Sequence, residues 1–199
     1  MNLAVDPLFS IPVLVTKEYY NFNEQEYLFL TNQKNKENVD NYISTSTSVL
    51  EHAQLKKLKN WIKDIINFYM YEVMKFKNVD CFITESWVNY THENQRHHMH
   101  SHPNSFVSGI LFLTDGDAQV NFVRNTEFFC LAPNVKEFNI LNSKKWQYPT
   151  DKGKLILFPS SLVHEVEPQK TNKKRVTLSF NTWLKGELGD KESSNYLSI

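Results

Sequence analysis

Apolar residues between Val49 and Lys77 recur every three or four positions, which is the spacing of one face of an α-helix. Lysines occupy much of the opposite face. The pattern predicts an amphipathic helix over 49–77 that covers one side of a flat layer, with Ser48 as its N-cap. By the same reasoning we expect a strand at 11–16, a short helix at 24–32 and an exposed polar loop at 33–48.

After Asp80 the helical period gives way to short β-like runs, which predict strands at 82–90, 105–113, 118–124, 154–158, 162–166 and 175–183. Asp115-Gly116 predicts a tight hairpin turn between the second and third of these strands. Residues 125–150 are irregular and aromatic, which fits a loop over the mouth of a barrel. Helices followed by many short strands predict an α+β, mainly β fold, a sandwich or barrel supported by N-terminal helices.

Length and composition limit the classes of function. The chain has 199 residues, which suits a single domain over 1–199 with helical support at about 20–80 and a β core at about 81–185. Basic and acidic residues both number 22, so we expect no nucleic-acid partner and no membrane-surface role. No apolar run would span a bilayer and no secretory signal is visible, so we expect a cytoplasmic protein. Two cysteines are too few for a disulfide framework or a Cys-only zinc site.

The histidines are concentrated in one segment: five of the seven lie within eleven residues, namely His92, His97, His98, His100 and His102. Residues two apart on a strand share a face, so His98, His100 and His102 can present imidazoles from one side while His97 faces away. Two such imidazoles and a third ligand from a distant strand would make a metal site with open positions. Histidines that are merely on the surface are the simpler alternative.

The C-terminal third adds a candidate third ligand and a polar strand face. His164 lies on the strand expected at 162–166, although a lone strand histidine is more often structural. The strand that follows alternates between an apolar face and a face made of Arg175, Thr177, Ser179 and Asn181. This polar face uses one of only three arginines and has no Lys or Glu, which suits an enclosed pocket. Arginine is the side chain suited to bidentate binding of a carboxylate. Trp87 and Asn89, also two apart, are expected to share a face near the barrel interior.

Several motifs together resemble a known family: SWVN at 86–89, HSHPNSFVSG at 100–109, GKLILFPSSLVHEVEP at 153–168 and RVTLSFN at 175–181, with LFSIPVLV near the start. The chain is similar to the iron(II)/2-oxoglutarate oxygenases of bacteria and marine bacteriophages. The resemblance is weakest at 20–80 and 125–150. It implies a double-stranded β-helix (jelly roll, cupin-like) with iron at one end of the barrel, and a place in the host cytoplasm for a phage-encoded chain.

The resemblance also implies roles for individual residues. His100, His102 and His164 would bind iron(II). Arg175 would hold the distal carboxylate of 2-oxoglutarate, with Thr177 or Ser179 as its hydroxyl partner. His102 stands where most such oxygenases have a carboxylate, which leaves a more positive site, and the pair His98 with His100 stays an alternative.

The implied reaction is hydroxylation of an unidentified small molecule or peptide side chain, with release of succinate and CO2. Candidate residues of the substrate pocket are Asn89, His98, Asn104 and Asn181. Two other readings stay open: a three-His cupin-like metalloenzyme without 2-oxoglutarate, and a non-catalytic jelly-roll protein whose structural zinc would take His98 as fourth ligand. No hydrolase elbow, P-loop or dinucleotide fingerprint is present. The oligomeric state is left open, with a homodimer as one option.

Overall fold

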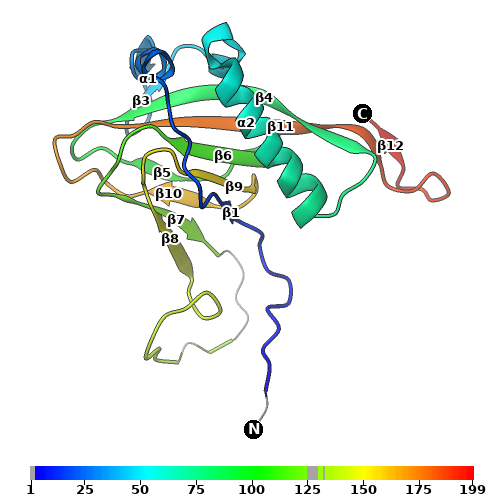
Figure 1. The fold of residues 1–199 in the computed structure, drawn as a ribbon. Helices are drawn as coiled ribbons and strands as arrows, with labels where there is room; N and C mark the ends of the chain where they lie inside the picture. The colour runs from blue at the N-terminus through cyan, green and yellow to red at the C-terminus, as the bar shows by residue number, and fades with distance from the viewer. Residues whose placement is uncertain (1–2, 125–129, 132) are drawn as a thin grey trace.

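The computed structural model describes residues 3–124, 130–131 and 133–199. Two antiparallel sheets face each other, and the long helix lies across the outer face of the larger sheet (Figure 1). The larger sheet has the order β1-β9-β6-β11-β4-β3-β2, with β12 paired to β11, and the smaller has the order β5-β10-β7-β8. This arrangement is a double-stranded β-helix, as the family resemblance of the sequence implies.

The strands of the larger sheet are β1 (Leu14–Val15), β2 (Asn35–Glu37), β3 (Tyr42–Ser44), β4 (Val79–Thr91), β6 (Val107–Phe112), β9 (Leu155–Pro159), β11 (Arg175–Leu188) and β12 (Leu197–Ser198). Those of the smaller sheet are β5 (His97–His100), β7 (Gln119–Val123), β8 (Lys145–Pro149) and β10 (His164–Val166). The helical elements are α1 (Glu24–Thr31), the 3-10 turns η1 (Val49–Glu51) and η2 (Ala53–Leu55), α2 (Lys56–Asn67) and the π-helical η3 (Phe68–Val73).

Two hydrophobic cores lie on opposite faces of the larger sheet. On the outer face, Leu58, Ile62 and Ile66 of α2 belong to the same core as Val176, Leu178 and Phe180 of β11. The inner core, between the sheets, includes Phe112, Phe122, Ile156 and Phe158. Successive side chains of a strand point to opposite faces. The residues of β11 that alternate with Val176, Leu178 and Phe180 therefore face the space between the sheets.

The helical segment differs from the single helix expected over 49–77. His52 has an extended backbone conformation, so the chain forms two 3-10 turns before α2 begins. Val49, Leu50 and Leu55 stay buried in these turns, which is why the apolar spacing continues through them. Ser48 makes no capping hydrogen bond, and the Leu50 amide instead donates to the Ser86 hydroxyl of β4 at 2.9 Å. A tertiary contact has replaced the local cap.

Three loop predictions are corrected. The polar stretch 33–48 contains β2 and β3, which extend the larger sheet beside β4. Asp115-Gly116 does not close a hairpin, because β6 pairs with β9 and β11 while β7 pairs with β8 and β10. The turn therefore leads the chain from one sheet to the other. Within 125–150, β8 is a strand paired to β7, and residues 125–129 and 132 of the predicted loop lie outside the described residues.

The remaining predicted elements agree with the structure. All six strands expected after Asp80 are present, although several are longer or shorter than expected. The short helix expected at 24–32 is α1, which begins at an Asn23 capping box. In the described ranges, no helix is both long and apolar enough to cross a membrane.

Candidate metal centre and the adjoining cavity

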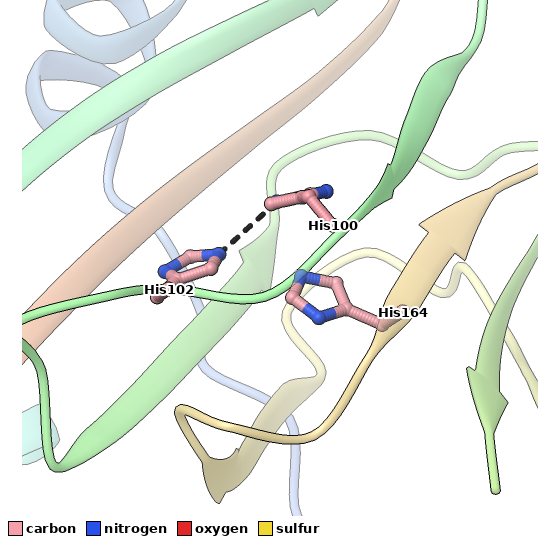
Figure 2. A group of neighbouring side chains, drawn as sticks. All are labelled: His100, His102 and His164. Atoms are coloured by element: carbon pink, nitrogen blue, oxygen red, sulfur yellow. Dashed lines mark hydrogen bonds between the residues drawn. The ribbon is translucent and has the colours of Figure 1, made fainter. Parts of the chain in front are cut away.

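Three histidines converge where the two sheets meet (Figure 2). His100 ends β5 and is paired in register with His164 at the start of β10. His102 follows β5 in a loop that is held to the end of β9, because its backbone amide donates to the Ser160 carbonyl at 2.9 Å. One nitrogen from each of the three rings lies within 4.8 Å of the others.

Each of these rings is oriented by an acceptor behind its Nδ1. The acceptors are the His98 carbonyl for His100 (2.8 Å), the Leu162 carbonyl for His164 (3.0 Å) and the Asn181 Oδ1 for His102 (2.5 Å). A carbonyl oxygen accepts but does not donate, so the proton of each neutral ring belongs on Nδ1. All three Nε2 atoms therefore carry a free lone pair. This is the arrangement typical of histidines that bind a metal.

The distance between two of these lone pairs tests whether a metal fits. The Nε2 atoms of His100 and His102 lie 3.1 Å apart, which is repulsive unless a cation lies between them. Two imidazole nitrogens that bind one metal at about 2.1 Å and at right angles would be about 3.0 Å apart. A set of three imidazoles suits iron, zinc, nickel or copper better than magnesium or calcium. The residues present fit a divalent transition metal.

Burial keeps the three rings neutral. It lowers the pKa of His164 to about 3 and that of His100 to about 4, and in both cases a neighbouring imidazole lowers the pKa further. Burial also lowers the pKa of His102, although its hydrogen bond to Asn181 acts in the opposite direction. At neutral pH the three nitrogens are therefore free of the proton that would compete with a metal.

A cavity adjoins the three histidines, and the larger sheet provides its opposite wall. Arg175, Thr177 and Ser179 of β11 line it together with Asn89 and Trp87 of β4. This confirms the prediction that Trp87 and Asn89 share a face inside the barrel. It also confirms that the polar face of β11 is enclosed, since Arg175, Thr177 and Ser179 are all buried.

Arg175 is a buried cation, with only 2% of its surface exposed. Its Nη1 donates to the Glu167 carbonyl at 3.2 Å and to the Gln169 Oε1 at 3.5 Å. Burial lowers the pKa of Arg175 to about 10, so the guanidinium stays charged at neutral pH. Among the residues that the structure describes, no carboxylate forms an ion pair with it. The negative charge of Asp117 raises the pKa of Arg175 and so offsets part of the effect of burial. A buried guanidinium without an ion pair is costly, and an anion in the cavity would lower that cost.

Asn89 also has unused hydrogen-bonding capacity. Its Nδ2 donates to the Ser179 hydroxyl at 3.1 Å and to the Thr177 hydroxyl at 3.5 Å. Its Oδ1 is buried and has no partner. The amide and both hydroxyls thus form a polar group on the cavity wall that can bind a polar ligand.

His97 lies in the cavity wall, whereas an unbroken strand would turn it away. His100 pairs with His164 but His97 pairs with Val166, so β5 contains one more residue than β10 over the same span. This β-bulge moves His97 to the same side as His100. The two rings are stacked with centroids 4.6 Å apart and planes 13° apart. Nothing in the sequence indicates the bulge.

Three of the four candidate pocket residues lie elsewhere. His98, Asn104 and Asn181 are not among the residues that line the cavity, and only Asn89 is. His98 contributes its carbonyl to His100, Asn104 is an exposed residue with a positive φ of 55°, and Asn181 contacts His102. The sequence analysis missed several residues that do line it, namely Thr91, His97, Ile110 and Val166. Extending the alternation of Trp87 and Asn89 by two would have found Thr91.

Comparison with known families finds one similarity, in the β-rich half of the chain. Residues 85–181, nearly half of the chain, match the family described as "Putative 2OG-Fe(II) oxygenase". The match includes all three histidines and Arg175. Over this segment the chain is similar to the 2OG-Fe(II) oxygenases. A search of curated protein sequences finds no match.

Solved structures support the same fold at low sequence identity. An oxidoreductase of the 2OG-Fe(II) oxygenase family from Burkholderia pseudomallei is 13% identical, with a TM-score of 0.60 over 85% of this chain and 83% of that one. HygX from Streptomyces hygroscopicus, solved with nickel and 2-oxoglutarate bound, is 12% identical, with a TM-score of 0.60 over 94% and 92%. The carbocyclase SnoK from nogalamycin biosynthesis is 11% identical, with a TM-score of 0.60 over 95% and 89%.

Proposed function

We propose that the protein is an iron(II)- and 2-oxoglutarate-dependent dioxygenase that hydroxylates its substrate. The observation that carries this proposal is the content of one cavity. Three imidazoles converge on one wall, and the other wall holds a buried arginine that forms no ion pair with any described residue. A metal satisfies the first wall and a carboxylate satisfies the second. A ligand that chelates a metal at one end and carries a carboxylate at the other satisfies both.

His100, His102 and His164 are the proposed iron ligands. They are neutral, their Nε2 atoms converge, and each ring is held by a hydrogen bond on its far side. In the described part of the chain the cluster contains no fourth histidine, cysteine or carboxylate, so the metal would keep open positions. When bound, iron(II) and 2-oxoglutarate supply the oxidation, in which O2 and 2-oxoglutarate yield succinate, CO2 and a hydroxylated substrate.

Arg175 is the proposed anchor for the distal carboxylate of 2-oxoglutarate. Its guanidinium offers two parallel donors to the two oxygens of a carboxylate. Thr177, Ser179 and Asn89 can hydrogen-bond to the same group, because they share the wall with Arg175. The burial of Arg175 excludes water, which strengthens the pairing of opposite charges.

The unidentified substrate, a small molecule or a peptide side chain, would approach from the open end of the cavity. Trp87, His97 and His100 are the half-buried lining residues, while the other lining residues are buried, so the cavity meets solvent beside these three rings. A substrate entering there would reach the metal before it reaches Arg175. We infer a cytoplasmic enzyme that acts without nucleic acid or membrane.

The buried guanidinium of Arg175 also favours this function over a three-His metalloenzyme without 2-oxoglutarate, because such an enzyme would bring no carboxylate to it. The test is an anaerobic titration of the apoprotein with iron(II), followed by 2-oxoglutarate. We expect one iron per chain and then a weak visible charge-transfer band, with succinate formed when O2 is admitted. Iron binding without the band would support the cupin-like alternative, and no iron binding at all would support a non-catalytic role.

A further inference from the structure

Asn181 is the only side chain among the three acceptors that orient the histidines. The acceptors for His100 and His164 are backbone carbonyls two residues before each ring, so they are fixed by the course of the chain. His102 depends instead on the carboxamide of Asn181, 79 residues away on β11, and its Nδ1 has a longer second contact with the Ser108 hydroxyl at 3.1 Å. The orientation of the His102 ring can therefore be changed by mutating its acceptor, which is not possible for the other two rings.

The Asn181 carboxamide is itself held in place. Its Oδ1 lies 2.5 Å from His102 Nδ1 and accepts from the Ser108 hydroxyl of β6 at 2.9 Å. Ser108 is hydrogen-bonded to Ser160 at 2.8 Å, and Ser160 donates to Ser105 at 2.7 Å. The Ser108 hydroxyl thus holds the amide, and Ser160 and Ser105 continue the hydrogen-bonded chain behind it. Asn181 lies outside the cavity lining, so it acts through His102.

All members of this network are uncharged. The three acceptors are two backbone carbonyls and one amide, and the residues behind the amide are serines. Among the described residues, no carboxylate is hydrogen-bonded to any of the three rings. Glu85, whose charge favours the protonated form of His102, is exposed on β4. Among the described residues, the groups that contact the three rings are therefore uncharged, and the one acidic residue whose charge acts on His102 is exposed.

We propose that Asn181 is a positioning residue with two effects: it directs the His102 Nε2 toward the metal, and its neutrality leaves the charge of the metal to be balanced by 2-oxoglutarate. This inference rests on the proposed function. The dianion then meets two positive charges, the metal at one end and Arg175 at the other. An uncharged residue at position 181 thus favours tight binding of the cosubstrate.

Two substitutions separate these effects. Asn181→Ala removes the shorter of the two contacts to His102 Nδ1 and leaves the Ser108 hydroxyl at 3.1 Å. Loss of a residue behind a metal ligand typically costs about 10- to 100-fold in metal affinity. Asn181→Asp keeps an acceptor at the same place and adds a charge, which makes the imidazole a stronger donor. Asn181→Asp is therefore expected to bind metal as tightly as the wild type or more tightly, yet to bind 2-oxoglutarate more weakly.

The experiment uses cobalt(II) as the probe, with affinity measured by calorimetry and the ligand field by visible absorption. 2-Oxoglutarate is then titrated into each cobalt-loaded protein. Ser108→Ala, which removes the donor that holds the amide, should lower cobalt affinity less than Asn181→Ala does. Asn121→Ala is the matched control, because Asn121 is a buried asparagine whose amide bonds to Glu165 and Glu167 and to none of the three histidines.

The expected pattern is weaker cobalt binding in Asn181→Ala, restored cobalt binding with a shifted spectrum in Asn181→Asp, and weaker 2-oxoglutarate binding in Asn181→Asp. Equal cobalt affinity in wild type, Asn181→Ala and Ser108→Ala would overturn the positioning role. Equal loss in Asn181→Ala and Asn181→Asp would overturn it too, since rescue by an acceptor would be missing. Either result would leave the proposed function intact, whereas a wild type that binds no cobalt would refute both.

Discussion

The two walls of the cavity are built in different ways. The wall with Arg175 consists of β4 and β11, strands of 13 and 14 residues that are paired without a shift from Arg175 to Asn181. The wall with the histidines consists of strands of three to five residues, one of which contains a bulge. Long regular strands place side chains by alternation alone. Short irregular strands need local hydrogen bonds to aim each ring, and the three Nδ1 contacts provide them.

The walls also differ in what supports them. Behind Arg175, the opposite face of β11 packs against α2 through Val176, Leu178 and Phe180. Behind the histidines, β5 is the edge strand of the smaller sheet, and Met99 on it is exposed. We therefore expect the Arg175 wall to be formed with or without ligands, and the histidine wall to be stabilised by its metal.

The largest effect should come from removing a ligand on the histidine wall. His164→Ala leaves two of three imidazoles, so metal affinity should fall by more than the roughly 100-fold that is the upper range for residues behind a ligand. Metal content after loading with iron(II), measured by elemental analysis, reports the loss.

His92→Ala and His52→Ala are the matched controls. His92 is exposed and its ring contacts Tyr42, while His52 caps η2 and contacts Phe29. Neither belongs to the cluster, so both variants should keep their metal. Equal metal content in all three variants would show that the metal binds elsewhere.

On the opposite wall, Arg175→Ala should weaken cosubstrate binding while leaving metal binding unchanged. Truncating one partner of a buried charge pair costs about 2–5 kcal/mol, or roughly 30-fold to several thousand-fold in affinity. Arg175→Lys should recover only part of the loss, because an ammonium lacks the planar pair of donors. Calorimetry with 2-oxoglutarate on the iron-loaded protein under nitrogen measures both. If Arg175→Ala binds 2-oxoglutarate as well as the wild type, the cosubstrate does not use this wall.

The same difference between the walls explains how far the sequence could be interpreted. Alternation along 175–181 and 86–89 predicts the Arg175 wall, and the structure agrees. On the other wall, the sequence analysis names His100, His102 and His164 as candidate ligands but expects His97 to face away. The bulge that turns His97 inward depends on pairing with β10 and not on the residues of β5. Likewise, the role of Asn181 depends on contacts with His102 and Ser108, which are distant in the chain.

The apoprotein should lose stability in mild acid, and the histidine wall should be the cause. The pKa values of His100 and His164 are about 4 and 3 in the folded state, against 6.5 for an ordinary histidine. The unfolded chain therefore takes up protons first as the pH falls below about 6.5, and folding stability falls toward pH 4. Each ring should contribute about 2 kcal/mol of that loss between pH 7 and pH 5.

Urea unfolding of the apoprotein at pH 7 and pH 5 measures this dependence. A His100→Gln, His164→Gln double variant should show a flatter profile, and His52→Gln should behave as the wild type. Saturating metal should also hold stability at pH 7 above that of the apoprotein. A double variant as sensitive to acid as the wild type would show that His100 and His164 are not the responsible groups.

The smallest effect concerns Asn89 on the Arg175 wall. Its amide bonds to Thr177 and Ser179, and its Oδ1 has no protein partner, so part of its hydrogen-bonding capacity is free for a ligand. Asn89→Ala should weaken 2-oxoglutarate binding by roughly 10-fold, the value of about one hydrogen bond to a charged group, with little change in melting temperature. Asn41→Ala is the control, since Asn41 is a buried asparagine outside the cavity lining. If Asn89→Ala lowers the melting temperature sharply and leaves the affinity for 2-oxoglutarate unchanged, Asn89 stabilises the sheet and does not bind the ligand.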